Sequence, residues 1–197
     1  MPLVGVRPEV VAEAEHAFGN LFHRLHYFAQ KLLGKGVDGA VALEGTIAEL
    51  EDLLRLVLDY TSPLVVEARP VTASTVLGSL SSALRVSSGA VASTPPDVSV
   101  LIDATHLSEA FQLMSQALGS EGDAIAAETL VDADGIGWLQ LQGLAPGRSG
   151  IASGKGLVAW AQAQKLIEAQ GGLLVGEDET GGVRWSVRLP LPSVEGR

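Results

Sequence analysis

Three of the chain's four histidines, His16, His23 and His26, lie in the stretch EHAFGNLFHRLHYF at residues 15–28. An imidazole can act as a nucleophile, a proton carrier or a metal ligand near neutral pH. The chain has no cysteine, and its His, Asp and Glu residues show no cluster with metal-ligand spacing. We therefore expect no metal site. Two interpretations of the histidines stay open: nucleophilic chemistry, or solvent-exposed positions on a packing helix.

The apolar residues around this stretch predict a helix from about residue 8 to residue 33. Their alternating spacing forms a seam along one side of a helix, made of Val11, Ala14, Phe18, Leu21, Leu25, Phe28 and Leu32. Relative to this seam, His16 and His23 share one outward heptad position, and Asn20 lies one turn after His16 on the same face. His26 and His106 are interpreted as ordinary solvated histidines.

A second helix is predicted from about residue 40 to residue 60, after a glycine-rich turn at residues 34–39. It repeats the same spacing, and its stripe consists of Leu43, Ile47, Leu50, Leu54 and Val57, widened by Leu53 and Leu56. Both apolar faces are too wide for one partner helix to cover. We expect the hairpin to pair with a second copy as a four-helix bundle in a homodimer. The alternative is that it packs on the rest of its own chain.

The second half of the chain predicts alternating helices and strands. We expect an extended linker at 67–70, helices at 73–84 and 157–169, strands at 98–102, 125–131 and 138–143, and a final hairpin. Asp103 is expected to cap a further helix, whose apolar face is Leu107, Ala110, Phe111, Met114 and Leu118. Turns are predicted at 120–124 and 132–135, and a glycine-rich loop at 144–156. Together these elements predict an α+β fold, with a small mixed sheet and helices on one face.

The composition narrows the possible functions. Hydrophobic residues make up 47% of the 197 residues, which is enough for a real core. A net charge of −10 argues against nucleic acid and against anionic membrane surfaces as partners. The absence of cysteine excludes disulfides, and no apolar run reaches the roughly 18 residues of a membrane span. We expect a soluble, cytoplasmic protein, with Trp138, Trp160 and Trp185 in its core.

Three stretches, in this order, resemble the core of bacterial histidine kinases. EHAFGNLFHRLHYFAQKLL resembles the H box, in which the phosphoacceptor histidine is followed four residues later by a polar residue; here these are His16 and Asn20. LDYTSPLVVEARPVTASTVLGSL resembles the end of the second helix and the lead into the ATP-binding domain. GKGLVAWAQAQKLIEAQGG with GGVRWSVRLPLP resembles the last glycine box and the terminal hairpin. The resemblance implies a dimerisation and phosphoacceptor hairpin at residues 1–65 and a degenerate α/β sandwich of the histidine-kinase ATPase type at 66–197.

Several residues that this family uses for ATP are replaced. The acid that normally follows the phosphoacceptor is Ala17, and the helix after Asp103 has no asparagine to hold magnesium, because Asn20 is the only asparagine of the chain. LQLQGLAPG offers no acid to hold adenine. Gly154 and Gly156 remain as vestigial phosphate contacts, and SGKG at 153–156 lacks the spacing of a P-loop. We therefore expect no nucleotide cofactor and no ATP hydrolysis.

The function that the resemblance implies is a histidine phosphotransferase of a phosphorelay. His16 would be the phosphoacceptor, Asn20 and Arg24 would assist it, and His23 would contact the partner. That partner would be a response-regulator receiver domain, which brings its own aspartate and magnesium. Two alternatives stay open: a non-catalytic pseudokinase scaffold that binds signalling partners, and an active histidine kinase with unusual nucleotide contacts.

Overall fold

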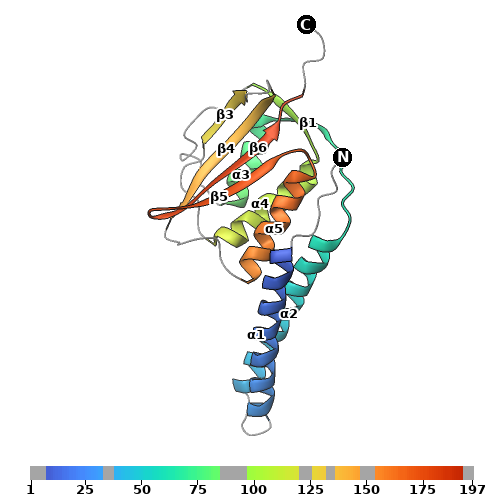
Figure 1. The fold of residues 1–197 in the computed structure, drawn as a ribbon, viewed down its shortest axis with the longest axis vertical. Coiled ribbons are helices and arrows are strands. Elements are labelled where there is room, and N and C mark those ends of the chain that lie inside the picture. The colour runs from blue at the N-terminus through green and yellow to red at the C-terminus, as the bar shows by residue number, and fades with distance from the viewer. Residues whose placement is uncertain are drawn as a thin grey trace.

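The computed structural model describes residues 8–32, 38–84, 97–119, 126–131, 136–146 and 154–192 of the chain. Helices α1 (Pro8–Leu32) and α2 (Asp38–Thr61) form a long hairpin that projects from a compact sandwich (Figure 1). The sandwich contains helices α3 (Ala73–Ala83), α4 (Ala104–Leu118) and α5 (Lys155–Glu168) and six strands. The predicted α+β fold, with a helical hairpin before a sandwich, is confirmed. The predicted turns at 120–124 and 132–135 and most of the predicted turn at 34–39 lie outside the described residues.

The interface between α1 and α2 follows the predicted seam over most of its length. Ala14, Leu21 and Leu53 are buried there, and Phe18, Leu50 and Val57 pack against them. The prediction is wrong in the first turn of α1, where Val10 is 4% exposed and Val11 is 38% exposed. Val10 is buried because it packs against Tyr60 at the end of α2 and Ala161 of α5. The sandwich therefore decides which face of this turn is covered.

The buried row of α2 also differs from the predicted stripe. Thr46 is fully buried, whereas Ile47 and Leu54, which were expected on the buried face, are exposed. Thr46 can lie there because its hydroxyl donates to the carbonyl of Ala42 at 2.9 Å, so no polar atom is left unpaired. Several apolar side chains of α2 therefore face solvent.

The main sheet has the strand order β3 (Ala126–Val131), β4 (Gly137–Pro146), β6 (Gly182–Pro190) and β5 (Leu173–Glu179). All three neighbouring pairs are antiparallel. A second, two-stranded sheet pairs β1 (Arg69–Thr72) with β2 (Ser99–Ile102), again antiparallel. The prediction of a mixed sheet is therefore wrong for the described strands.

Two strand boundaries also correct the predictions. The predicted linker at 67–70 ends inside β1, because Arg69 and Pro70 already pair with β2. The predicted glycine-rich loop begins later than residue 144, since residues 144–146 continue β4 in register with β6. Residues 147–153 lie outside the described part of the chain.

One face of the main sheet builds the core with the helices. Leu139, Leu141, Val187 and Leu189 are fully buried against residues of α3, α4 and α5, including Leu80, Phe111, Met114 and Leu166. The opposite face of the sheet carries a polar network, in which Gln140 donates to Glu128 and accepts from Arg188. This division confirms that the helices cover one face of the sheet.

Two of the three tryptophans are confirmed as core residues. Trp185 is 1% and Trp160 is 3% exposed, whereas Trp138 is only partly buried. The ring of Trp185 lies against β4, where a Cβ atom added at Gly143 would come within 2.5 Å of it. A glycine is therefore needed at this position to admit the indole.

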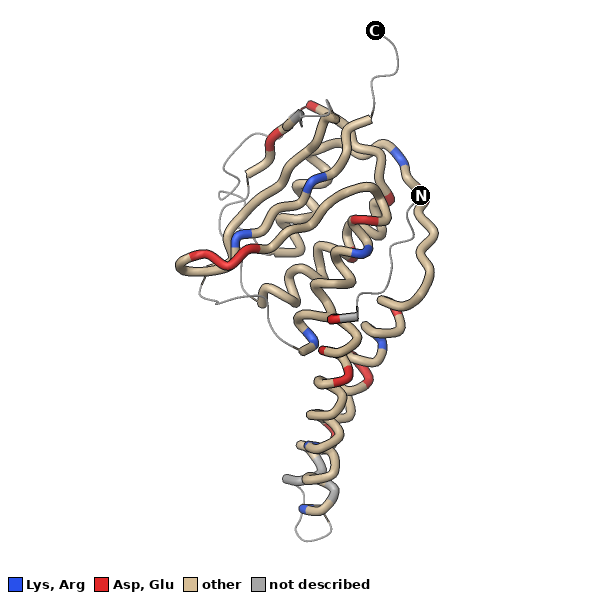
Figure 2. The backbone as a smooth tube through the Cα atoms, viewed as in Figure 1, with Lys and Arg blue, Asp and Glu red and all other residues tan. Residues whose placement is uncertain are grey.

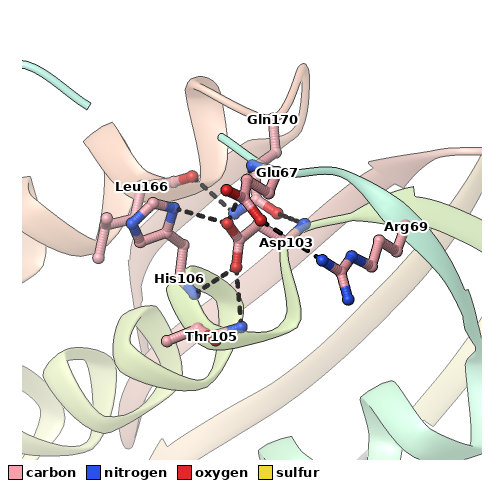
Figure 3. A network of polar contacts seen from close by, with 7 residues as sticks. All are labelled: Glu67, Arg69, Asp103, Thr105, His106, Leu166 and Gln170. Atoms are coloured by element: carbon pink, nitrogen blue, oxygen red, sulfur yellow. Dashed lines mark hydrogen bonds and ion pairs between the residues drawn. The ribbon is translucent and has the colours of Figure 1, made fainter. Parts of the chain in front are cut away.

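Asp103 anchors the segment that leads from the hairpin into the sandwich (Figure 3). Its carboxylate caps α4, as predicted, by accepting from the backbone N–H groups of Thr105 and His106. It also accepts from the N–H of Glu67 at 3.1 Å, and this bond is the main reason that the pKa of Asp103 lies below its ordinary value. His106 Nδ1 lies 3.4 Å from the Asp103 carboxylate, in the interior of this network.

The charged residues are unevenly distributed. Lys and Arg are spread singly over the described chain, whereas Asp and Glu form a continuous run at the tip of the β5–β6 hairpin and are otherwise scattered over the sandwich and the helical hairpin (Figure 2). Among the described helices, none is both long and apolar enough to cross a bilayer.

Candidate functional site

A cavity of about 700 Å³ lies where the start of α5 meets the side of the hairpin. We call it the His16 cavity. Its lining residues are Glu13, His16, Ala17, Asn20 and Leu21 of α1, Glu49 and Leu53 of α2, and Gly154 and Lys155 at the start of α5. The fold thus brings His16 and Asn20 together with Gly154, a predicted site residue far along the chain. Arg24, His23 and Gly156 do not line the cavity.

His16 is exposed on α1, and its ring is in contact with Asn20. The Nδ2 atom of Asn20 lies 3.2 Å from Nε2 of His16, one helical turn away. An amide nitrogen only donates, so Nε2 of His16 is the acceptor in this contact. Sequence spacing predicted this pair, because residues four apart are neighbours on a helix surface.

Arg24 and His23 have different surroundings. The Nη1 atom of Arg24 lies 2.7 Å from Oε2 of Glu49, which forms an ion pair across the hairpin. Glu49 lines the His16 cavity, so the positive charge of Arg24 balances the negative charge of one carboxylate in the cavity wall. His23 is exposed on the same side of α1 as His16. His26 is also exposed, with its Nε2 2.9 Å from Nε2 of Gln30.

The start of α5 is held by a carboxylate of α1. The backbone N–H of Gly154 donates to Oε1 of Glu13 at 2.7 Å. Gly154 has a φ of 62°, a conformation that favours glycine. A Cβ atom built on Gly154 would lie 3.9 Å from Cβ of Ala17, the residue that follows His16. The N–H that the resemblance assigned to phosphate is therefore bonded to the chain's own carboxylate, and Gly156 lies in the first turn of α5.

Lys155 forms a second contact between the start of α5 and the hairpin. Its Nζ atom lies 2.7 Å from Oδ2 of Asp52, and both side chains are about half exposed. The hydrogen bond from Lys155 is the main reason that the pKa of Asp52 lies below its ordinary value. This pair places a cation at the rim of the His16 cavity.

Deeper contacts fix α5 along the hairpin. Val158 is fully buried in one cluster with Ala14, Leu21 and Leu53 of the hairpin. Farther along α5, the buried Lys165 donates to the carbonyls of Asp59, Tyr60 and Ser62, at the end of α2. A cation at a helix C-terminus is favoured by the dipole of the helix. The sandwich is thus held to the hairpin by apolar packing in the middle and by polar contacts at both ends of α5.

Sequence reasoning missed Glu13, Lys155 and Lys165. Glu13 and Gly154 are 141 residues apart, and Lys155 and Asp52 are 103 apart, so no local pattern joins them. Lys165 offered a signal, because it is a lysine within the otherwise uncharged stretch GLVAWAQAQKLI. A charged residue at a buried position needs a partner, and that need could have marked it.

The described residues contain no group of three or more His, Asp and Glu side chains that could hold a metal ion. The region where a nucleotide loop would lie, residues 147–153, is outside the described part of the chain. What the described site presents is therefore an exposed imidazole, an amide on its Nε2 and charged groups around a cavity.

Comparison with known proteins gives matches at the level of structure. No protein-family model and no curated sequence matches the chain. The histidine kinase AdeS of Acinetobacter baumannii superposes with a TM-score of 0.54 at 15% identity, over 90% of this chain and 98% of that one. The histidine kinase ThkA, solved in complex with the response regulator protein TrrA, superposes with a TM-score of 0.60 at 15% identity, over 96% of this chain and 63% of that one.

The chain has the fold of a histidine kinase core. A third structure, full-length ShkA in complex with AMPPNP, agrees with a TM-score of 0.51 at 18% identity, over 98% of this chain and 48% of that one. The structural resemblance predicted from the sequence motifs is confirmed. At these identities the likeness establishes the fold, and the activity has to be argued from the site.

Proposed function

We propose that this chain is a histidine phosphotransferase of two-component signalling, which exchanges a phosphoryl group with a response-regulator receiver domain and does not hydrolyse ATP. Nε2 of His16, released from its contact with the Asn20 amide, attacks the phosphorus of the receiver's aspartyl phosphate. The N–P bond forms as the P–O bond to the aspartate breaks, and the receiver supplies the magnesium. The observation that carries the proposal is the exposed imidazole of His16, whose Nε2 lone pair faces Asn20 on the hairpin of a histidine kinase fold.

The two parts of the chain would have separate functions. Residues 1–65 would present the phosphoacceptor and dimerise, and residues 66–197 would form a degenerate ATPase-like sandwich. The bond from Gly154 to Glu13 supports the absence of a nucleotide, because a carboxylate already takes the N–H at the start of α5. The N–H group that a phosphate would use at a helix N-terminus is then engaged within the chain.

The receiver domain as partner is supported by the structure of ThkA, which was solved with a response regulator protein. His23, exposed one heptad after His16, would lie within the surface that a receiver covers. Arg24 would assist indirectly, by neutralising Glu49 beside the incoming phosphoryl group.

The homodimer is supported by apolar side chains that the hairpin leaves exposed. On α2, Ile47, Leu54 and Leu58 are each more than 40% exposed and share one side of the helix. On α1, the exposed Val11 and Phe22 lie three turns apart on one side. Because the helices run antiparallel, their helical phase places both groups on the same side of the hairpin, away from His16. A second copy packing there would complete a four-helix bundle.

The direct test is incubation with a radiolabelled phosphorylated receiver domain. Label should move to the wild-type chain and be lost in His16→Ala, while His26→Ala, an exposed histidine of α1 outside the proposed receiver surface, should keep it. Label that persists in His16→Ala would show that another residue accepts the phosphoryl group. The experiment also separates the alternatives, because a pseudokinase scaffold would bind the receiver equally well with and without His16 and take up no label.

The scaffold alternative is favoured by Ala17, since the family's neighbouring acid is missing. An active kinase would instead require magnesium-dependent ATP binding. A titration calorimetry experiment that found low-micromolar ATP affinity would contradict the proposed lack of a nucleotide.

A further inference from the structure

We propose that Lys155 of the sandwich binds the phosphoryl group on His16 of the hairpin, so that the phosphoryl site is built by both parts of the chain. This inference rests on the proposed function of His16. It also assigns a role to the sandwich that does not involve a nucleotide.

The first support is position. His16 and Lys155 line the same cavity, although they are far apart along the chain. Their neighbours hold the two segments together: a Cβ atom built on Gly154 would lie 3.9 Å from Cβ of Ala17, and the N–H of Gly154 bonds to Glu13. The start of α5 is thus fixed beside the phosphoacceptor, and Lys155 is carried with it.

The second support is the charge balance of the His16 cavity. Two of its walls are the carboxylates of Glu13 and Glu49. A phosphoryl group adds a charge of about −1.5 to −2 near neutral pH. Placed between two carboxylates, that group needs a cation within reach.

Among the described residues, Lys155 and Arg24 are the cations that form ion pairs at this cavity, and their partners distinguish them. If Arg24 moved to the phosphoryl group, it would leave Glu49 uncompensated in the wall of the same cavity. Lys155 pairs with Asp52, which does not line the cavity and is 56% exposed. Water can solvate Asp52 when Lys155 leaves, because an exposed ion pair is weak. A lysine also has a flexible stem and a compact charge, which suit such an exchange of partners.

The experiment uses phosphoramidate, a small phosphodonor that needs no partner protein. Nε2 of His16 attacks its phosphorus, the new N–P bond forms, the P–N bond of the donor breaks and ammonia leaves. Uptake at His16 and its subsequent hydrolysis are followed in the full chain for the wild type, Lys155→Met, Lys155→Arg and Asp52→Asn. Circular dichroism checks that each variant is folded.

We expect Lys155→Met to take up the phosphoryl group about fivefold more slowly, as follows from losing one exposed charge contact. Lys155→Arg should restore most of the rate. Asp52→Asn should be at least as fast as the wild type, because it frees the lysine while breaking the same contact between sandwich and hairpin. A purely structural role of the Lys155–Asp52 pair would slow both Lys155→Met and Asp52→Asn.

The experiment distinguishes an error in the role of Lys155 from an error in the proposed function of His16. Labelling of Lys155→Met at the wild-type rate would overturn the role of Lys155 and leave the proposed function intact. Absence of label in the wild type, or label that remains in His16→Ala, would overturn the proposed function and with it the inference.

Discussion

Replacing Lys165 with methionine should destabilise the attachment of the sandwich to the hairpin. The side chain of Lys165 is 7% exposed, and its Nζ atom donates to the carbonyls of Asp59 at 3.2 Å, of Tyr60 at 2.7 Å and of Ser62. The last carbonyls of a helix have no intrahelical donor, so the lysine satisfies groups that would otherwise stay unpaired. Methionine has a similar length and volume, and the substitution therefore removes the charge and the donors without opening a large cavity.

The expected loss is about 2–4 kcal/mol in the free energy of unfolding. A hydrogen bond from a charged donor contributes about 1.5–3 kcal/mol, and three are broken here. The contributions do not add, because burial opposes the charge: desolvation lowers the pKa of Lys165 below its ordinary value, although the nearby Asp59 acts in the other direction. The loss should therefore be nearer to that of one or two such bonds.

The lowered pKa of Lys165 also makes the difference in stability between the wild type and Lys165→Met depend on pH. The folded chain binds the Lys165 proton less tightly than the unfolded chain does. Stability therefore rises with pH between the lowered pKa of the folded state and the ordinary value of 10.5. The gap in stability between wild type and Lys165→Met should be smallest below the lowered pKa and should widen as the pH rises through that range.

Urea denaturation followed by tryptophan fluorescence measures this effect, since the buried Trp160 and Trp185 report on the sandwich. The matched control is Lys155→Met, which removes the other lysine of α5. Its side chain is about half exposed and paired with an exposed carboxylate, so its unfolding midpoint should not change measurably. Equal midpoints for the two variants would refute the view that Lys165 acts as a buried cap of α2.

Three further substitutions test other contacts. Glu13→Ala should release the start of α5, because it removes the acceptor of the Gly154 N–H, and hydrogen exchange at the Gly154 amide should accelerate. Asp103→Ala should lose about 1–2 kcal/mol of stability at neutral pH by removing the cap of α4 and the bond from Glu67. Because the pKa of Asp103 is lowered in the folded state, urea titrations at several pH values should show this loss shrinking as the pH falls through that pKa, below 3.8. Leu54→Lys should convert the proposed homodimer to a monomer by light scattering, whereas Ala48→Lys, at an exposed position of α2 turned away from Ile47 and Leu54, should leave its mass unchanged.

Sequence patterns correctly predicted the features that are determined by residues within a few positions of one another. The periodicity of α4 placed all five of its predicted face residues in the core, and Asp103 caps it as expected. Both are consequences of helix geometry within a few residues. His16 and Asn20 were paired for the same reason.

The sequence patterns gave wrong predictions where residues far away in the chain determine which side chains are buried or which segments pair as strands. Val10 is buried in place of Val11 because α5 covers that side of the first turn. Thr46 shows a different failure: a polar residue is tolerated in the buried row because its hydroxyl donates to the Ala42 carbonyl one turn back, which a pattern of apolar residues does not reveal. The strand β1 exists because β2 lies beside it, and a strand of four residues carries little signal of its own.

The cavity could not be predicted because it belongs to the junction between hairpin and sandwich. The apolar periodicity of α1 predicts the face on which His16 lies, but it does not predict which residues of the sandwich lie opposite that face. Glu13, Gly154 and Lys155 become part of the site only through contacts that span more than a hundred residues.

Residue 17, where alanine replaces the family's acid, lies at this junction. Ala17 lines the His16 cavity, and its Cβ atom would be in van der Waals contact, at 3.9 Å, with a Cβ atom built on Gly154. A carboxylate is present one turn earlier, at Glu13, and it bonds the N–H of Gly154. Glu13 thus fixes the start of α5 beside the imidazole of His16, and this contact carries Lys155 to the rim of the cavity.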